Sequence, residues 1–144
     1  MKEISSAIKL GAAAFIRREY TILAMFVTIV AILIGIFLPQ PLWEPHNNML
    51  NLQLPAAYMF GSFCSALAGY IGLNIATRAN AKVANAAQGG LRKAFQIGFR
   101  GGAVMGLSVV GVGLLGISVV YWLTGDPAII LGYSFGASSL SLFA

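Results

Sequence analysis

The sequence predicts an all-α fold: a polytopic transmembrane bundle of about four helices with an N-terminal amphipathic helix. Hydrophobic residues make up 58% of the 144 positions, charged residues only 9%, and the mean hydropathy is +0.83. Soluble domains carry about 25% charged residues, so this chain could not cover a surface in water. The second observation is the arrangement of its apolar residues in long runs separated by short polar segments. A lipid bilayer is the solvent that suits such a sequence.

Four apolar runs are candidate membrane spans, because about 20 residues at 1.5 Å per residue cross the hydrocarbon core. We predict that residues 1–144 form one helical membrane unit, with spans at about 20–38, 56–76, 101–123 and 127–144. No charge follows Asp126, and the sequence closes on Leu142-Phe143-Ala144. A spanning helix normally ends in an interfacial flank, so we expect the fourth span to be cut short and the chain to be part of a larger membrane domain.

The stretch before the first span predicts an amphipathic helix over residues 3–19. Ile4, Ile8 and Phe15 recur there at helical spacing, with charged residues between them. A targeting segment is the alternative interpretation. The following apolar run is too long for one and has no small-residue cleavage site, so a retained helix is expected.

The connections between the spans carry turn signals. Pro39, Pro41 and Pro45 follow the first span, and residues 39–55 predict a polar loop with Trp43 as an interfacial anchor. The second span continues as an alanine-rich helix over 77–88, which the pair Gly89-Gly90 should break. The sequence TGDP at 124–127 predicts a turn whose proline starts the last helix.

The distribution of basic residues predicts the orientation. All nine Lys and Arg lie in residues 1–19 and 77–100, and none lies in 39–55 or 124–127. The positive-inside rule therefore places 1–19 and 77–100 in the cytoplasm, for a multi-pass protein of a bacterial-type inner membrane. A net charge of +5 on a soluble surface would suggest nucleic acid, but these clusters flank apolar runs, so the expected partner is the lipid bilayer and no nucleic acid.

Small residues at helical spacing predict where the helices meet. Helix association in lipid depends on close approach, which small residues permit. Three spans carry such stripes, and we predict helix-packing roles for their members: Gly61, Ser65, Gly69, Gly102, Gly106, Gly113, Gly132 and Gly136. The alternative is the general enrichment of glycine in membrane helices.

Chemically reactive groups are scarce in the spans, which contain no Asp, Glu, Lys, Arg or His. Such residues usually mark proton relays and ion sites, so we assign no catalytic and no metal-binding residue. The lone His46 has only Glu44 near it, and the lone Cys64 cannot form an internal disulfide. Most of the remaining polar groups of the spans are expected to make contacts between helices: Thr28, Ser62, Ser65, Asn74, Ser108, Ser118, Ser134, Ser138, Ser139 and Ser141.

Three stretches resemble the membrane-bound, ion-pumping pyrophosphatases: GYIGLNIATRANAKVANAA (69–87), GLRKAFQIGFRGGAVMGLSVVGVGLLG (90–116) and GYSFGASSLSLFA (132–144). The opening MKEISSAIKLGAAAFIRREY also resembles the family, so the likeness covers nearly the whole chain. The resemblance implies a homodimer with an inner and an outer ring of helices. It further implies hydrolysis of magnesium pyrophosphate at the cytoplasmic face, coupled to outward movement of H⁺ or Na⁺.

The resemblance also implies that this chain is an N-terminal fragment, with three outer-ring helices and most of one inner-ring helix. Ser138 matches a serine near the ion pathway. The lysine and aspartates that hold Mg²⁺-pyrophosphate in the family would follow Ala144, so a chain lacking them is expected to be inactive alone. Its partners would be the remaining helices of the pump. The choice of ion and the effect of K⁺ depend on residues outside this sequence.

Two other classes stay open at this stage. One is a small four-helix membrane transporter, which normally depends on a membrane-embedded carboxylate that this sequence lacks. The other is a non-catalytic accessory subunit that packs through its glycine stripes. The coding sequence after Ala144 would discriminate them.

Overall fold

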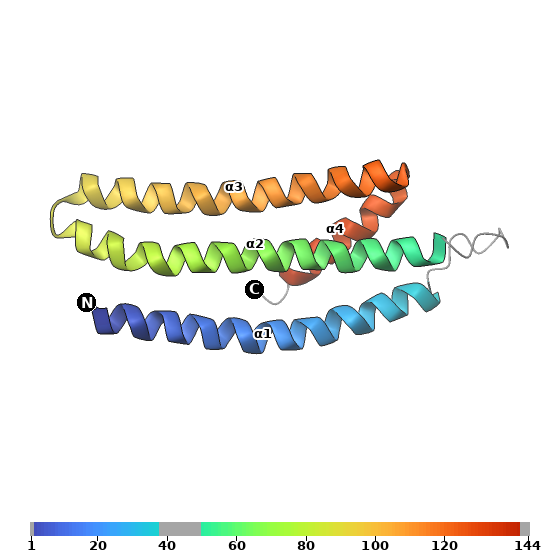
Figure 1. Ribbon diagram of the computed structural model, residues 1–144, viewed down its shortest axis with the longest axis horizontal. Helices are drawn as coiled ribbons and strands as arrows, with labels where there is room; N and C mark the ends of the chain where they lie inside the picture. The colour runs from blue at the N-terminus through green and yellow to red at the C-terminus, as the bar shows by residue number, and fades with distance from the viewer. Residues whose placement is uncertain (1, 38–49, 142–144) are drawn as a thin grey trace. The chain divides into compact units, whose positions relative to one another are not determined.

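The computed structural model describes residues 2–37 and 50–141, and every element in this part of the chain is an α-helix. The helices, shown in Figure 1, are α1 (Lys2–Phe37), α2 (Leu50–Ala87), α3 (Leu91–Thr124) and α4 (Pro127–Ser141). The predicted all-α class is confirmed. Three segments are long and apolar enough to cross a membrane: Ser6–Phe37, Leu52–Ala87 and Leu91–Thr124.

The predicted amphipathic helix over 3–19 and the first span form one continuous helix, α1. Its sequence contains no proline and no pair of glycines, so nothing interrupts the backbone hydrogen bonds between Lys2 and Phe37. With 36 residues it is about 54 Å long, which exceeds the roughly 30 Å hydrocarbon core. Part of α1 therefore has to extend beyond the core if the helix spans it.

The start of α2 corrects one prediction. The loop predicted over 39–55 is wrong for residues 50–55, because α2 begins at Leu50. Pro55 lies inside the helix, near its start, where the missing N–H removes only one intrahelical hydrogen bond. Trp43, His46 and the rest of 38–49 lie outside the described residues.

The break between α2 and α3 is confirmed at the predicted glycine pair. Gly89 N donates to Ala86 O at 2.9 Å, and Gly90 N donates to Ala87 O at 3.2 Å. Gly90 has a φ of 117°, which side-chain-bearing residues rarely adopt. The chain can therefore reverse within these residues and begin α3 at Leu91.

The predicted turn before α4 is also confirmed. Gly125 has a φ of 65°, and its N–H donates to Tyr121 O at 2.8 Å, which closes the C-terminus of α3. Asp126 then caps α4, because its Oδ1 accepts a hydrogen bond from Ala128 N at 2.8 Å. The described part of α4 has 15 residues and is about 22 Å long, shorter than the hydrocarbon core; residues 142–144 of the predicted span lie outside the described part.

The chain divides into two compact units, and the second holds most of the buried side chains. Unit 2 comprises Glu19–Ala66 and Val112–Ala144. One cluster joins α1, α2 and α4 through Leu23, Val27, Ala31, Ile34, Tyr58 and Leu140. A second joins α2, α3 and α4 through Ala57, Cys64, Val120, Ile129 and Tyr133. Within this unit α4 therefore shares a buried cluster with each of the other three helices.

Unit 1 comprises Met1–Arg18 and Leu67–Gly111 and contains all nine Lys and Arg residues of the sequence. Its α2 and α3 segments run antiparallel. Contacts at the α3 glycines show this: a Cβ on Gly101 would lie 3.0 Å from Ala79 Cβ, and one on Gly98 would lie 3.7 Å from Val83 Cγ2. Small residues thus set the close approach of these two helices.

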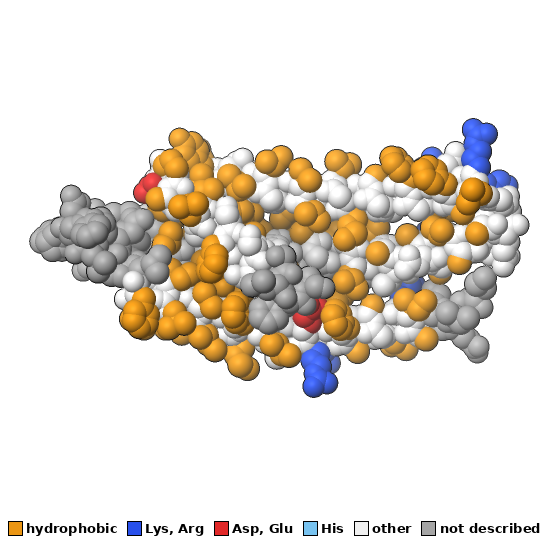
Figure 2. Space-filling model, turned by 180° about the vertical axis from the view of Figure 1, so that it is seen from behind, with side chains coloured by type: hydrophobic (Ala, Val, Ile, Leu, Met, Phe, Trp, Pro, Cys, Tyr) orange, Lys and Arg blue, Asp and Glu red, His pale blue; other side chains and the backbone are white. Residues whose placement is uncertain are grey.

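Much of the exposed surface of the helices is apolar. Leu107, Trp122 and Leu131 are 74%, 83% and 71% exposed, and many other large hydrophobic side chains are exposed with them. Figure 2 shows hydrophobic side chains spread over the visible face. A surface of this kind is incompatible with water and suits lipid or further apolar helices.

The α4 cap gives a first prediction. Replacement of Asp126 by Ala removes the acceptor for Ala128 N and should lower the free energy of unfolding by about 1 kcal/mol. SDS-induced unfolding in mixed micelles, followed by circular dichroism, measures the change. Asp126→Asn retains a capping oxygen and should stay close to the parent chain; equal losses in both variants would contradict the capping role.

Candidate functional site

The backbones of α2 and α4 touch at two glycines, Gly61 and Gly136. A Cβ placed on Gly61 would overlap the carbonyl oxygen of Tyr133, and a Cβ on Gly136 would overlap the carbonyl oxygen of Tyr58. The obstruction in both cases is backbone, which no side-chain rotation can relieve. We call this contact, together with the hydrogen bonds around it, the α4 seat. Its geometry requires glycine at both positions.

A third glycine extends the contact toward the start of both helices. A Cβ on Gly132 would lie 3.0 Å from the carbonyl oxygen of Leu54 and 3.1 Å from its Cδ1 atom. Gly132 and Gly136 are one helical turn apart, so both fall on the face of α4 that meets α2. The predicted glycine stripe on α4 thus packs against α2.

Buried hydroxyl groups join the two helices at the seat. Ser62 Oγ lies 3.0 Å from the Tyr58 carbonyl oxygen of its own helix and 3.0 Å from the Gly136 carbonyl oxygen of α4, so both oxygens share its proton. The Tyr58 hydroxyl donates to Ser139 Oγ at 3.2 Å. Ser139 Oγ in turn donates to the Phe135 carbonyl oxygen at 2.8 Å. Every hydroxyl in this chain of bonds has a partner, as a water-free interior requires.

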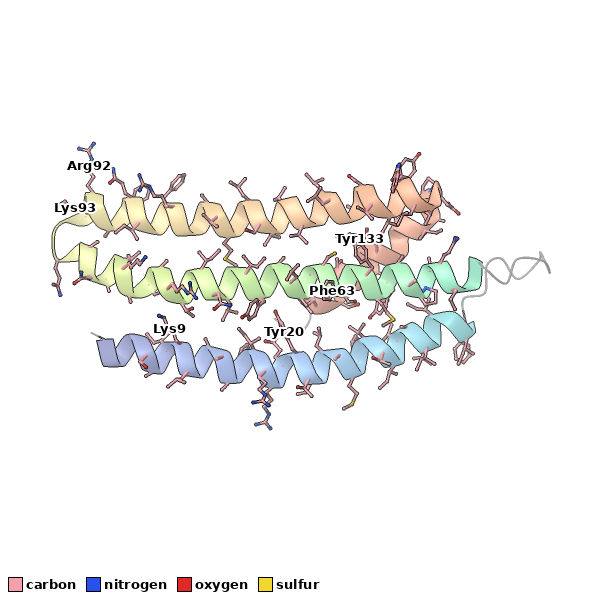
Figure 3. The ribbon with its side chains drawn as sticks, in the orientation of Figure 1. Lys9, Tyr20, Phe63, Arg92, Lys93 and Tyr133 are labelled. Carbon is pink, nitrogen blue, oxygen red and sulfur yellow. The ribbon has the colours of Figure 1, made fainter. Side chains whose placement is uncertain are left out.

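Tyr133 of α4 also contacts α3. Its phenol oxygen lies against Gly116, where a Cβ would overlap it, and its hydroxyl donates to the Gly113 carbonyl oxygen at 3.3 Å. Figure 3 shows Tyr133 reaching from α4 between α2 and α3. Its ring also lies 5.9 Å from that of Phe60, a distance typical of a favourable aromatic pair.

The chemistry available at the seat is structural. It offers neutral hydroxyls, backbone carbonyls and the buried free thiol of Cys64. Within residues 2–37 and 50–141, no three His, Cys, Asp or Glu side chains come together to hold a metal ion. These groups can fix the position of a helix, but the described residues provide no charged group here to bind pyrophosphate or relay a proton.

The remaining predicted packing residues lie elsewhere. A Cβ added to Gly102, Gly106 or Gly113 would meet no atom of a neighbouring helix within 4 Å, and Gly102 and Gly106 are exposed. Ser65 and Gly69 are half-buried on α2. Their roles in packing against other helices stay predictions.

Ser138, predicted to lie near an ion pathway, is exposed on α4. Its neighbour Ser139 is buried in the seat, so the two serines lie on different faces of the helix. The pathway role of Ser138 stays a prediction.

Several polar side chains do not make the expected contacts between helices. Thr28, Ser108 and Ser118 donate to carbonyl oxygens four residues earlier in their own helices, at 2.7, 2.7 and 2.8 Å. Asn74 also bonds within its own helix, to Tyr70 O at 3.3 Å. A local carbonyl is always within reach of a hydroxyl in a helix, so such a side chain can form a hydrogen bond without a neighbouring helix.

Sequence reasoning missed the two buried tyrosines, Tyr58 and Tyr133. Tyr58 is 0% exposed and Tyr133 is 2% exposed, yet a tyrosine in an apolar run carries no spacing signal of its own. Their positions near Gly61 and Gly136 were the available clue, since a tyrosine beside a close helix contact can reach across it.

Comparison with known proteins decides the family. The family model described as inorganic H⁺ pyrophosphatase matches residues 1–144. The chain belongs to this family. A K⁺-insensitive pyrophosphate-energised proton pump from Methanosarcina mazei is 45% identical over 144 residues, which are 100% of this chain and 20% of that protein. A protein of the same description from Caldanaerobacter subterraneus is 39% identical over 158 residues, covering 100% of this chain and 22% of the relative.

The family includes relatives named for a different ion. A protein from Clostridium tetani, whose name describes a putative K⁺-stimulated pyrophosphate-energised sodium pump, is 41% identical, and the match covers 100% of this chain and 20% of the relative. This H⁺-pyrophosphatase-family chain thus spans about one fifth of the length of the curated relatives it matches. No solved structure matches it.

The seat predicts opposite signs for glycine-to-alanine substitutions. Alanine is favoured over glycine in a helix by about 1 kcal/mol. At Gly61 or Gly136 the added methyl group meets backbone, so each substitution should lower the free energy of unfolding by about 1–3 kcal/mol. At Gly113, where the space is open, the free energy should be unchanged or rise by up to about 1 kcal/mol. Unfolding in SDS measures all three, and a Gly136→Ala chain as stable as Gly113→Ala would refute the seat.

The hydrogen bond between Tyr58 and Ser139 predicts energetic coupling. Tyr58→Phe and Ser139→Ala each remove one side of the bond, and the pair should show a coupling free energy of about 0.6 kcal/mol in a double-mutant cycle. Tyr58→Phe combined with Thr28→Val is the control, because Thr28 bonds within its own helix. Strictly additive effects for Tyr58 and Ser139 would show that the bond does not contribute.

Proposed function

We propose that this chain is part of a pyrophosphate-energised ion pump, which couples hydrolysis of magnesium pyrophosphate to translocation of H⁺ or Na⁺ out of the cytoplasm. The observation that carries the proposal is the family match over all 144 residues. Relatives named as proton pumps and as sodium pumps match with similar identity, 45% and 41%, so either ion is compatible with this segment. The proposed assembly is a homodimer.

Within that pump the proposed role of residues 1–144 is scaffold. Closely packed spans that contain no Asp, Glu, Lys, Arg or His fix the geometry of neighbouring helices and do no hydrolysis themselves. The proposed Mg²⁺ enters as its complex with pyrophosphate, and its ligands lie in other parts of the pump. Sensitivity to K⁺ would be decided there too, since the relatives' names differ in this respect.

The proposed orientation places the basic residues in the cytoplasm. Unit 1 carries all nine Lys and Arg, whereas the sequence of unit 2 carries none. Residues 1–19 and 77–100 would then be cytoplasmic ends of helices in a multi-pass inner-membrane protein. The exposed Trp122 at the end of α3 would lie at the opposite interface.

A chimera tests the proposal directly. The 45% identity to the Methanosarcina mazei pump extends over the whole chain, so this chain can replace the matching fifth of that pump. We expect the chimera, in membrane vesicles, to retain pyrophosphate-driven proton uptake. The unmodified pump is the positive control. A chimera that inserts into the membrane but neither hydrolyses pyrophosphate nor moves protons would count against the proposal.

The chain alone provides the converse prediction. Residues 1–144 in detergent or liposomes should show no Mg²⁺-dependent release of phosphate from pyrophosphate, because the seat has no charged group to bind it. A colorimetric phosphate assay with the intact Methanosarcina mazei pump as positive control makes the measurement. Turnover above the uncatalysed rate would place a hydrolytic site within the chain and contradict the scaffold role.

A further inference from the structure

Unit 1 contains a cavity between the N-terminal part of α1 and the C-terminal half of α2. Its volume is about 620 Å³, and twelve residues line it. Ligand pockets in proteins typically measure about 300–1,000 Å³, so a small ion or molecule fits inside this one. All of its lining residues belong to unit 1, so the cavity is separate from the α4 seat, whose residues belong to unit 2.

The antiparallel course of α1 and α2, which Figure 1 shows, decides which side chains share an end of the cavity. The first lining residue of α1, Ser6, lies at the same end as the last lining residue of α2, Arg78. Lys9 follows Ser6 by about one helical turn, so it belongs to this end too. We call Ser6, Lys9 and Arg78 the basic end. Arg17 lies about 12 Å further along α1 and already has an interaction partner, so it is not counted with them.

The basic end carries two positive charges. Lys9 contributes an ammonium group from α1, and Arg78 contributes a guanidinium group from α2. Neither Asp nor Glu is among the twelve lining residues that the structure describes. Figure 3 shows Lys9 on the side of α1 that faces α2. Two like charges repel each other, and an anion between them would replace that repulsion with two attractions.

The donors at the basic end match a phosphate group better than a carboxylate. A guanidinium group presents a planar fork of N–H donors, which phosphate oxygens accept in pairs. The Lys9 ammonium group and the Ser6 hydroxyl supply further donors from the opposite wall. Two positive charges balance a phosphate dianion, whereas one carboxylate would neutralise only one of them. Asn74 and Thr77 contribute little, because their side chains bond to carbonyl oxygens within α2.

Water-soluble ions can reach the basic end. Ser6, Lys9 and Arg78 are all exposed. In the sequence they lie outside the predicted spans at 20–38 and 56–76. A soluble anion therefore approaches these side chains from the aqueous phase and does not have to enter the hydrocarbon core.

We propose that the basic end binds a soluble phosphate anion between the Lys9 ammonium group and the Arg78 guanidinium group, with Ser6 as a further donor. Inorganic phosphate is the simplest anion of this class. The site does not rest on the proposed pump function, because it involves only side chains of unit 1 and no hydrolysis.

Chemical protection of Lys9 tests the proposal on the full chain in neutral detergent. An amine-reactive acylating reagent modifies exposed lysines, and mass spectrometry of the peptides gives the rate at each position. Inorganic phosphate should slow the acylation of Lys9 relative to chloride at equal ionic strength. Lys93 of α3 is exposed and does not line the cavity, so its rate should not change. No slowing at Lys9, or equal slowing at both lysines, would overturn the proposal.

Arg78 provides the test from the opposite helix. In the Arg78→Gln chain the phosphate concentration that half-protects Lys9 should rise about fivefold, which is the effect of one charge about 4 Å from another in water. Arg78→Lys keeps the charge and should restore most of the protection. Protection of Lys9 that is the same in Arg78→Gln as in the parent would show that no anion bridges the two helices, and would overturn the proposal.

The matched control removes a charge from another place. Arg92 is exposed at the start of α3 and does not line the cavity, as Figure 3 shows, so Arg92→Gln should leave the protection of Lys9 unchanged. Equal loss of protection in Arg92→Gln and Arg78→Gln would reduce the effect to net charge and contradict a defined site. Circular dichroism confirms that each variant keeps its helical content.

Two further anions separate soluble phosphate from other sources of negative charge. Phosphatidylglycerol added to the detergent should protect Lys9 no more than phosphatidylcholine does. Protection by phosphatidylglycerol without protection by inorganic phosphate would identify a lipid site and overturn the proposal. Acetate at equal ionic strength should protect Lys9 less than phosphate does, and equal protection would reassign the basic end to carboxylates.

Discussion

The arrangement of unit 2 depends on a contact between backbones, where α4 lies on α2 at Gly61 and Gly136. In water, burial of large apolar side chains would hold such helices together. Inside a bilayer that force is absent, because lipid is as apolar as the side chains. Short-range packing and hydrogen bonds have to take its place. The seat provides both, since the missing side chains allow contact and Ser62 and Tyr58 then reach acceptors on α4.

This constraint explains why polar residues inside the apolar helices behave differently from one another. Ser62 and Ser139 bond across the contact because α2 and α4 approach closely at their positions. Ser108 and Ser118 lie on α3 away from such a contact and bond to their own helix. A serine thus bonds across helices only where a neighbouring helix lies close, and elsewhere bonds to its own helix alone.

Much of the architecture could be predicted because its signals are local. Gly89-Gly90 and Gly125-Asp126 mark the two described turns. Gly90 and Gly125 both adopt a positive φ, which glycine permits and other residues rarely adopt. The loop predicted over 39–55 was wrong for residues 50–55, because Pro55 is tolerated inside a helix near its start. The contacts between different helices were harder to predict. The stripes at Gly61 and Gly136 identified the contact faces, but spacing does not reveal which stripe meets which, nor that Tyr133 would fill the space beside Gly116.

The proposed pump function would make the seat important, because a pump needs its helices held in register while an ion passes. The most direct measurement is pyrophosphate-driven proton uptake by vesicles carrying the Methanosarcina mazei chimera with Gly136→Leu. Our account predicts that this protein inserts into the membrane but loses both hydrolysis and transport, because leucine at this position collides with the Tyr58 carbonyl group and displaces α4. Transport equal to that of the unsubstituted chimera would contradict it.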